Sequence, residues 1–228
     1  MTGSADRELA ERMAQLARAV AAPRSVNDVL ADVTREVIEL IPTADAAGIL
    51  FVGKGGGFDS VANTSGLPEQ LDRLQMTFNE GPCLEAARED LIVRCDDFAR
   101  DERWPRYSAA AAELGVRSGL SFKLYTASQT AGALNLFALQ PNAFDTQDEN
   151  IGAILAAHAA AAVLASRHNE QLQSALSTRD RIGQAKGIIM ERYNVDDVAA
   201  FDMMRRLSQD TNTKLTDIAQ RVIDTRGA

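Results

Sequence analysis

A proline-free stretch in the second half of the chain constrains the fold more than any other feature. No proline follows Pro141, and nothing in Asp148–Tyr193 excludes a helix. Gly152, Gly183 and Gly187 weaken the helix without interrupting it, because a glycine inside a helix costs about 1 kcal/mol relative to alanine. We therefore predict one long helix that connects a mixed N-terminal part to a C-terminal part.

An apolar seam with alternating steps of four and three residues runs along this helix, which is the spacing of a coiled coil. Its positions are Ile151, Leu155, His158, Ala162, Ala165, Asn169, Leu172 and Leu176. The seam favours a homodimer whose register is set by His158 or Asn169. A stripe that only covers the sheet of its own domain is the competing interpretation.

Two helices are predicted before the first strand. The first covers Arg7–Ala22, has a narrow apolar seam and ends at Pro23. In the second, Ser25 and Asp28 have the spacing of a capping box, and an apolar stripe continues to Ile41.

The middle of the chain alternates strands with turns and short helices. Ala46–Val52 and Phe58–Asn63 flank the glycines of Gly53–Gly57 and predict a hairpin, and no helix pattern follows to support a phosphate-binding loop. Of two later strands, Thr130–Leu139 is apolar on both faces, as expected of a central strand. The shorter predicted elements are helices Pro68–Leu74, Gly81–Arg88 and Pro105–Leu114 and strand Leu91–Cys95. This order predicts an α+β fold built on one antiparallel sheet.

Four short motifs of this half are similar to those of a known family. They are Glu80–Ala86, Arg103–Pro105, Gly115–Ser118 and Gly132–Leu136. Together they resemble the GAF domains that precede ANTAR domains in actinobacteria, over roughly Leu9–Ala165. The resemblance implies a sensor domain that holds a small ligand between its sheet and covering loops. The candidates for lining such a pocket are Phe51, Phe58, Trp104, Phe122 and Asn135.

Plain core packing is the competing interpretation of these five residues, since large apolar side chains in a sheet are more often core. Phe144–Glu149 resembles only the end of the motif of cyclic-nucleotide-binding GAF domains, so no nucleotide ligand follows and the cofactor stays unknown. Within that segment, Thr146 and Glu149 are predicted to cap the long helix.

Thr178–Thr225 has the pattern of three short amphipathic helices, whose apolar stripes can close into a bundle. The stripes are Ile182, Ala185, Ile189 and Tyr193, then Val198, Phe201, Met204 and Leu207, then Leu215, Ile218, Ala219, Val222 and Ile223. Because Tyr193 and Phe201 both lie on apolar stripes, aromatic stacking is not expected to be the main device for binding.

This segment resembles the ANTAR domain. The matching residues are Arg181-Ile182, Ala185-Lys186-Gly187, Met190-Glu191-Arg192, Ala200-Phe201, Arg206-Leu207-Ser208, Lys214-Leu215 and Ile218-Ala219. The resemblance implies binding of paired RNA stem-loops, which prevents transcription termination. It assigns the RNA surface to Gln184, Lys186, Gly187, Arg205, Arg206, Lys214 and Arg221. Such donors suit phosphate oxygens and exposed loop bases.

The charge distribution agrees weakly with this assignment. The net charge of −8 is unfavourable for nucleic acid, but from Ser177 onward nine Arg and Lys residues stand against eight Asp and Glu. The remainder has 15 against 24 and is therefore the acidic part.

Other functional classes are disfavoured by the sequence. No run of 18 apolar residues lacks a charge and the N-terminus is polar, so we expect a cytoplasmic protein without a membrane span. Cys83 and Cys95 do not make a disulfide framework or a zinc site and are expected to be buried. His158 and His168 have no nucleophile placed nearby, which favours a binding protein over an enzyme.

The predicted organisation is a GAF-like sensor at residues 1–165, a coiled-coil-like helical linker at 166–177 and an ANTAR domain at 178–228. The predicted function is that of a homodimeric antitermination regulator with RNA stem-loops as partner and an unidentified small molecule as ligand. The alternative is a small-molecule sensor whose helical tail docks a protein without touching nucleic acid. A bundle that reads DNA also fits the spacing, and only the family resemblance decides for RNA.

Overall fold

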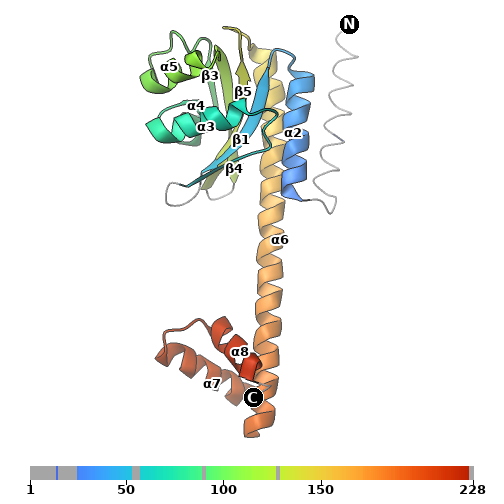
Figure 1. The fold of residues 1–228 in the computed structure, drawn as a ribbon. Helices are drawn as coiled ribbons and strands as arrows, with labels where there is room; N and C mark the ends of the chain where they lie inside the picture. The colour runs from blue at the N-terminus through green and yellow to red at the C-terminus, as the bar shows by residue number, and fades with distance from the viewer. Residues whose placement is uncertain (1–13, 15–24, 53–56, 89–90, 127–128, 226–228) are drawn as a thin grey trace. The chain divides into compact units, whose positions relative to one another are not determined.

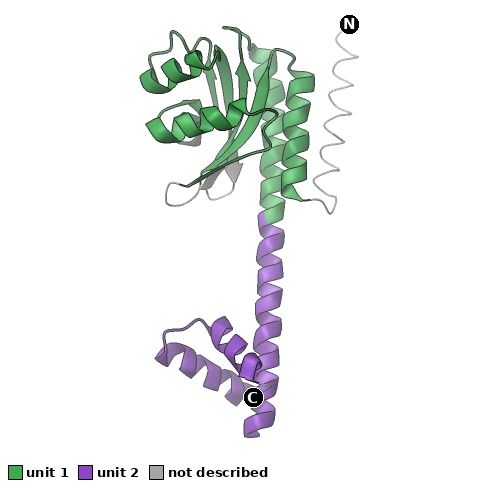
Figure 2. Cartoon of the chain, in the orientation of Figure 1, with its two compact units in different colours: residues 1–166 green, residues 167–228 purple. Residues whose placement is uncertain are grey.

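The computed structural model describes residues 14, 25–52, 57–88, 91–126 and 129–225. Two compact units divide the chain, an N-terminal unit of residues 1–166 and a C-terminal unit of residues 167–228 (Figure 2). The predicted helix Arg7–Ala22, apart from Ala14, and residues 53–56 of the predicted glycine turn lie outside the described residues.

One antiparallel sheet organises the N-terminal unit. Its strands are β1 (Ala46–Val52), β2 (Phe58–Val61), β3 (Ile92–Cys95), β4 (Ser118–Thr126) and β5 (Gln129–Ala138). They are arranged in the order β2-β1-β5-β4-β3, so β5 is the central strand. The prediction from its apolar faces is confirmed, because every residue from Gly132 to Ala138 is buried.

Helices cover both faces of this sheet (Figure 1). On one face, α2 (Val26–Leu40) and the first part of α6 (Thr146–Tyr193) form the larger core, which includes Leu120, Phe122 and Leu155. On the other face lie α3 (Leu67–Phe78), α4 (Pro82–Arg88) and α5 (Pro105–Glu113), with a second core around Phe98, Trp104 and Tyr107. Cys83 and Cys95 are buried on this side, as predicted.

Side chains cap the N-termini of α2 and α6. The capping residue of α2 is the predicted one, and that of α6 is not. Ser25 Oγ accepts the Asp28 amide at 3.2 Å. At α6, however, Asp145 Oδ1 accepts the amides of Gln147 at 2.7 Å and Asp148 at 3.0 Å, and Asp148 Oδ2 accepts the Asp145 amide at 3.0 Å. The predicted Thr146 and Glu149 box is therefore wrong by one residue, because α6 begins at Thr146 and Asp145 occupies the N-cap position that faces the free amides.

The apolar seam of α6 has two different environments. Ile151, Leu155 and Ala162 are buried in the core of the N-terminal unit, so this half of the seam covers its own sheet. Farther along, Leu172 is 50% and Leu176 54% exposed. Only this second half is available for a dimer contact.

The C-terminal unit is built from the last part of α6 together with α7 (Asp197–Asp210) and α8 (Leu215–Asp224). Its small core consists of Ala185, Ile189, Ala200, Met204, Ile218 and Ala219. The stripes predicted for α6 and α8 are confirmed except at Tyr193, which is 58% exposed at the helix end.

The stripe predicted for α7 is wrong at three of its four positions. Val198 is 68%, Phe201 36% and Leu207 47% exposed, while Ala200 and Met204 are buried. Helix α7 is apolar on more than one side, and the small Ala200 allows close approach of its neighbours, so this side forms the core.

The predicted fold class is confirmed: an antiparallel α+β domain followed by a long helix and an all-helical domain. Among the described residues, α6 is also long and apolar enough, by composition only, to cross a membrane, with a mean hydropathy of 1.3 in one 18-residue window. Of that window 39% is buried, and Ile151 and Leu155 of α6 lie in the core of the N-terminal unit.

Candidate functional site

The six polar residues and one glycine predicted as the RNA surface are distributed over three helices. Gln184, Lys186 and Gly187 lie on α6, Arg205 and Arg206 on α7, and Lys214 and Arg221 at the start and in the last turn of α8. All are exposed except Lys186, which is half-buried. They are therefore accessible, but not all of them line one cleft.

Two of these cations are paired with carboxylates. Lys186 forms an ion pair with Asp197, which lies in the first turn of α7. Arg205 Nη2 lies 2.9 Å from Asp202 Oδ1, one turn back on the same helix. The Arg205 pair is exposed, and in the Lys186 pair the carboxylate is 63% exposed. Ion pairs open to solvent contribute about 0–1 kcal/mol, so a phosphate group can compete with the carboxylate for the cation.

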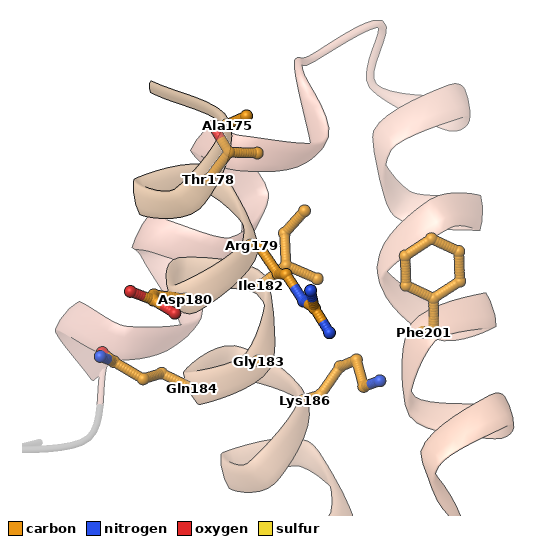
Figure 3. Close-up of a pocket in the computed structure, with 9 residues that line it drawn as sticks. All are labelled: Ala175, Thr178, Arg179, Asp180, Ile182, Gly183, Gln184, Lys186 and Phe201. Atoms are coloured by element: carbon orange, nitrogen blue, oxygen red, sulfur yellow. The ribbon is translucent and has the colours of Figure 1, made fainter. Parts of the chain in front are cut away.

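A cleft of about 680 Å³ lies beside α6 and α7. Its lining consists of Ala175, Thr178, Arg179, Asp180, Ile182, Gly183, Gln184, Lys186 and Phe201 (Figure 3). The cleft therefore brings together two of the predicted residues, Gln184 and Lys186. The other five do not belong to its lining.

Arg179 and Phe201 were missed as site residues by sequence reasoning. Arg179 precedes Gly183 by four residues and Lys186 by seven, so all three lie on one side of α6. This helical spacing is the signal in the sequence that could have identified Arg179 as a site residue. Phe201 was placed in the core by its periodicity, and only the orientation of α7 exposes it.

The five residues predicted to line a pocket in the N-terminal unit are not gathered in one cavity. Phe122 belongs to the core under α2 and α6, whereas Trp104 belongs to the core on the opposite face. Phe51 and Phe58 line a cleft of about 710 Å³ beside the β1-β2 hairpin, together with residues of α2 and α3. Asn135 is fully buried in β5, on the face that carries Phe137.

A buried polar cluster surrounds Asn135. Its Oδ1 accepts the Ser121 hydroxyl at 2.7 Å, and its Nδ2 lies 3.4 Å from Asp72 Oδ1. The other carboxylate oxygen of Asp72 accepts the Ser60 hydroxyl at 2.6 Å. Burial raises the pKa of Asp72 to about 7, and the hydrogen bonds from Ser60 and Asn135 oppose this rise.

Tyr107 lies in the same region of the N-terminal unit. Its hydroxyl is buried and has no hydrogen-bond partner within the part of the chain that the structure describes. Burial raises the pKa of this hydroxyl well above its usual range, and the carboxyl group of nearby Asp72 acts in the same direction. In the described residues, no group of three or more His, Cys, Asp or Glu side chains could hold a metal ion.

Comparison with known families assigns both units. Residues 23–163 match the GAF domain, and residues 170–223 match the ANTAR domain. No curated protein matches the chain.

Solved structures similar to the chain include GAF domains. The GAF domain from a phosphoenolpyruvate-protein phosphotransferase of Coxiella burnetii has 20% sequence identity and a TM-score of 0.57, covering 72% of this chain and 96% of that one. The free methionine-R-sulfoxide reductase of Neisseria meningitidis has 18% identity and a TM-score of 0.53, covering 71% and 91% of the two chains. Similarity at these identities establishes the fold.

Proposed function

Because this chain belongs to the GAF domain family and also carries an ANTAR domain, we propose that it is an antitermination regulator whose GAF domain controls RNA binding. Both domains are regulatory rather than catalytic, and the protein is accordingly a cytoplasmic binding protein rather than an enzyme. The sensor occupies residues 1–165, the helical linker 166–177 and the RNA-binding domain 178–228. Helix α6 runs from the first domain into the last and transmits the signal.

The observation that carries this proposal is the presence of Lys186 in an open cleft of the ANTAR domain. Gln184 also belongs to the lining of this cleft, and its side chain extends to the other side of α6. The proposed RNA contacts are Gln184, Lys186, Gly187, Arg205, Arg206, Lys214 and Arg221. Gly187 suits a close approach of RNA to α6, because a Cβ atom there would meet no other atom within 4 Å. The Asp197 and Asp202 carboxylates hold Lys186 and Arg205 only until phosphate replaces them.

The working form is a homodimer joined along α6. Leu172 and Leu176 support this, because both are largely exposed and are spaced by four residues on one side of the helix. Two ANTAR domains in one dimer increase the effective concentration for a second adjacent stem-loop. Replacing both leucines with glutamate should give a monomer in sedimentation analysis, and an unchanged dimer would remove this contact from the proposal.

Binding to RNA with two adjacent hairpins tests the main function. The RNA is first identified by sequencing fragments cross-linked to the full chain, and its affinity is then measured over a salt series. We expect Lys186→Ala and Lys214→Ala each to weaken binding and to lower the slope of log affinity against log salt by about one. Arg73→Ala is the matched control, since Arg73 is an exposed cation of the GAF domain.

A second function is favoured by the exposed apolar side chains Met203 and Leu207, which lie one turn apart on α7. They suit a protein partner that docks on the helical tail without nucleic acid. Negligible RNA binding at every salt concentration, with a partner recovered through these two side chains, would support this alternative. Strongly salt-dependent RNA binding supports the antitermination function.

A further inference from the structure

The cleft lined by Phe201 combines features that phosphate binding alone does not require. Ala175, Ile182 and Phe201 provide an apolar surface, and Arg179 and Lys186 provide positive charge beside it. A site that binds only phosphate needs the cations but not the apolar surface. The combination corresponds to a nucleotide, in which a flat apolar base is attached to an anionic phosphate.

Phe201 is available because the domain closes its core without it. Ala200 and Met204 supply the core contacts of α7, whereas Phe201 is 36% exposed and lines the cleft. An accessible aromatic ring offers a face on which any base can stack, and such stacking contributes appreciably to single-strand binding. The Phe201 ring can therefore serve as a stacking surface outside the core.

The charges at the cleft favour an anionic occupant. Figure 3 shows Arg179 and Lys186 extending from α6 toward the side of Phe201, whereas Asp180 and Gln184 extend to the other side of α6. Lys186 is paired with Asp197, while Arg179 has no ion pair within the described part of the chain. An apolar helix of a partner protein in this cleft would remove both cations from water without compensation.

Gly183 keeps the cleft open on the α6 side. A Cβ atom built at this position meets no atom within 4 Å beyond its own turns of helix, so no other part of the described chain fills the space beside it. A flat group can approach the helix there and still contact Phe201 across the cleft.

We propose that this cleft holds one unpaired base from the loop of an RNA hairpin, stacked on Phe201, with Arg179 and Lys186 binding the adjoining phosphates. The proposal rests on the RNA-binding function proposed above and deepens it by assigning the recognition of a loop base. Phe201 and Arg179 thereby become specificity and affinity residues in addition to the predicted cations.

The experiment uses the full chain and RNA hairpins with a constant stem and a randomised loop. A hairpin selected for binding to the wild type is resynthesised with an abasic site at each loop position in turn. We expect one position at which loss of the base weakens binding to the wild type about 5- to 150-fold. For Phe201→Leu, binding should already be weakened and the same abasic site should have little further effect, while Phe201→Tyr should retain the sensitivity.

Two variants separate a lost stacking surface from a disturbed fold. Gly183→Leu fills the cleft from α6 at a position with open space, and it should abolish the sensitivity to the same abasic site. Tyr193→Leu removes an exposed aromatic ring that does not line the cleft, and it should bind like the wild type. Circular dichroism of each variant monitors the helical content.

The outcomes distinguish the proposed base pocket from the RNA-binding function on which it rests. In one outcome the wild type binds hairpins and Lys186→Ala weakens this binding, but Phe201→Leu and Gly183→Leu retain full sensitivity to every abasic site. The base pocket is then refuted, and RNA binding stands. If Phe201→Leu changes only the monomer–dimer equilibrium, the cleft is a contact between two copies and the base pocket is equally refuted. Absence of any hairpin binding by the wild type overturns both proposals.

Discussion

The ammonium group of Lys186 in α6 forms an ion pair with the carboxylate of Asp197 in the first turn of α7. The pair links two helices of the ANTAR domain at the edge of the proposed RNA surface. Its carboxylate is 63% exposed, while the lysine side chain is only 22% exposed. The carboxylate therefore competes with any phosphate that approaches Lys186.

Asp197→Asn should strengthen RNA binding and weaken the fold slightly. The substitution removes a negative charge beside the proposed phosphate site, so we expect tighter binding at low salt. It also removes a favourable charge from a helix N-terminus, which costs about 0.3–1 kcal/mol of unfolding free energy. Asp210→Asn, at the other end of α7, changes the net charge equally and should leave RNA affinity closer to the wild type. Equal gains in both variants would show that only net charge matters.

Asp72→Asn should remove a pH dependence of stability. The pKa of Asp72 is about 7 in the folded protein, against about 3.9 for an unfolded aspartate. Between these values the folded state holds one proton more than the unfolded state, so stability falls as pH rises, by up to about 1.4 kcal/mol per unit.

Urea unfolding of the wild type and Asp72→Asn from about pH 4 to pH 8 measures this difference. The variant should gain stability relative to the wild type as pH rises through the window, with most of the change complete near the folded pKa. Asp59→Asn on β2 is the control, because Asp59 is exposed. Parallel curves for the wild type and Asp72→Asn would mean that the buried carboxyl does not retain its proton.

Gly152→Ala and Gly187→Ala should change stability in opposite directions, although both glycines lie in α6. A methyl group at Gly152 would overlap the Phe122 ring, so we expect a loss of about 1–3 kcal/mol from overpacking. At Gly187 the added methyl meets open space, and the higher helix propensity of alanine should stabilise the protein by up to about 1 kcal/mol. Thermal unfolding of both variants measures the contrast, and stabilisation by Gly152→Ala would contradict the packing.

Asp145→Ala should destabilise the N-terminus of α6 more than Thr146→Ala does. Asp145 accepts two amide hydrogen bonds there, and loss of such a cap costs about 0.5–2 kcal/mol. Chemical unfolding of the two alanine variants compares them directly. A larger effect at Thr146 would restore the capping box predicted from the sequence.

Most local elements could be predicted because their signals are local. Ser25 caps α2, the alternation in β4 separates Leu120 from Ser121, and the apolar run of β5 identifies the central strand. The motifs of both domains are also contiguous in the sequence. Neither kind of signal requires knowledge of which elements meet in space.

The candidate sites could be predicted only in part, because they depend on contacts between distant segments. The cluster of Asp72 with Asn135 joins residues 63 positions apart, and no local pattern distinguishes it from exposed polar groups. The five residues predicted for a sensor pocket lie on opposite faces and at the edge of the sheet. Their residue types alone could therefore not show which of them share a cavity.

The residue order of this chain was sufficient for the α+β architecture, the long α6 and the two family resemblances, because periodicity and short motifs encode them directly. The exposure of Phe201 and the pairing of Lys186 with Asp197 required the packed bundle. Helix α7 is apolar on several sides, and the choice among them depends on which side its neighbours cover. Packing therefore left Phe201 in the cleft, where periodicity had assigned it to the core.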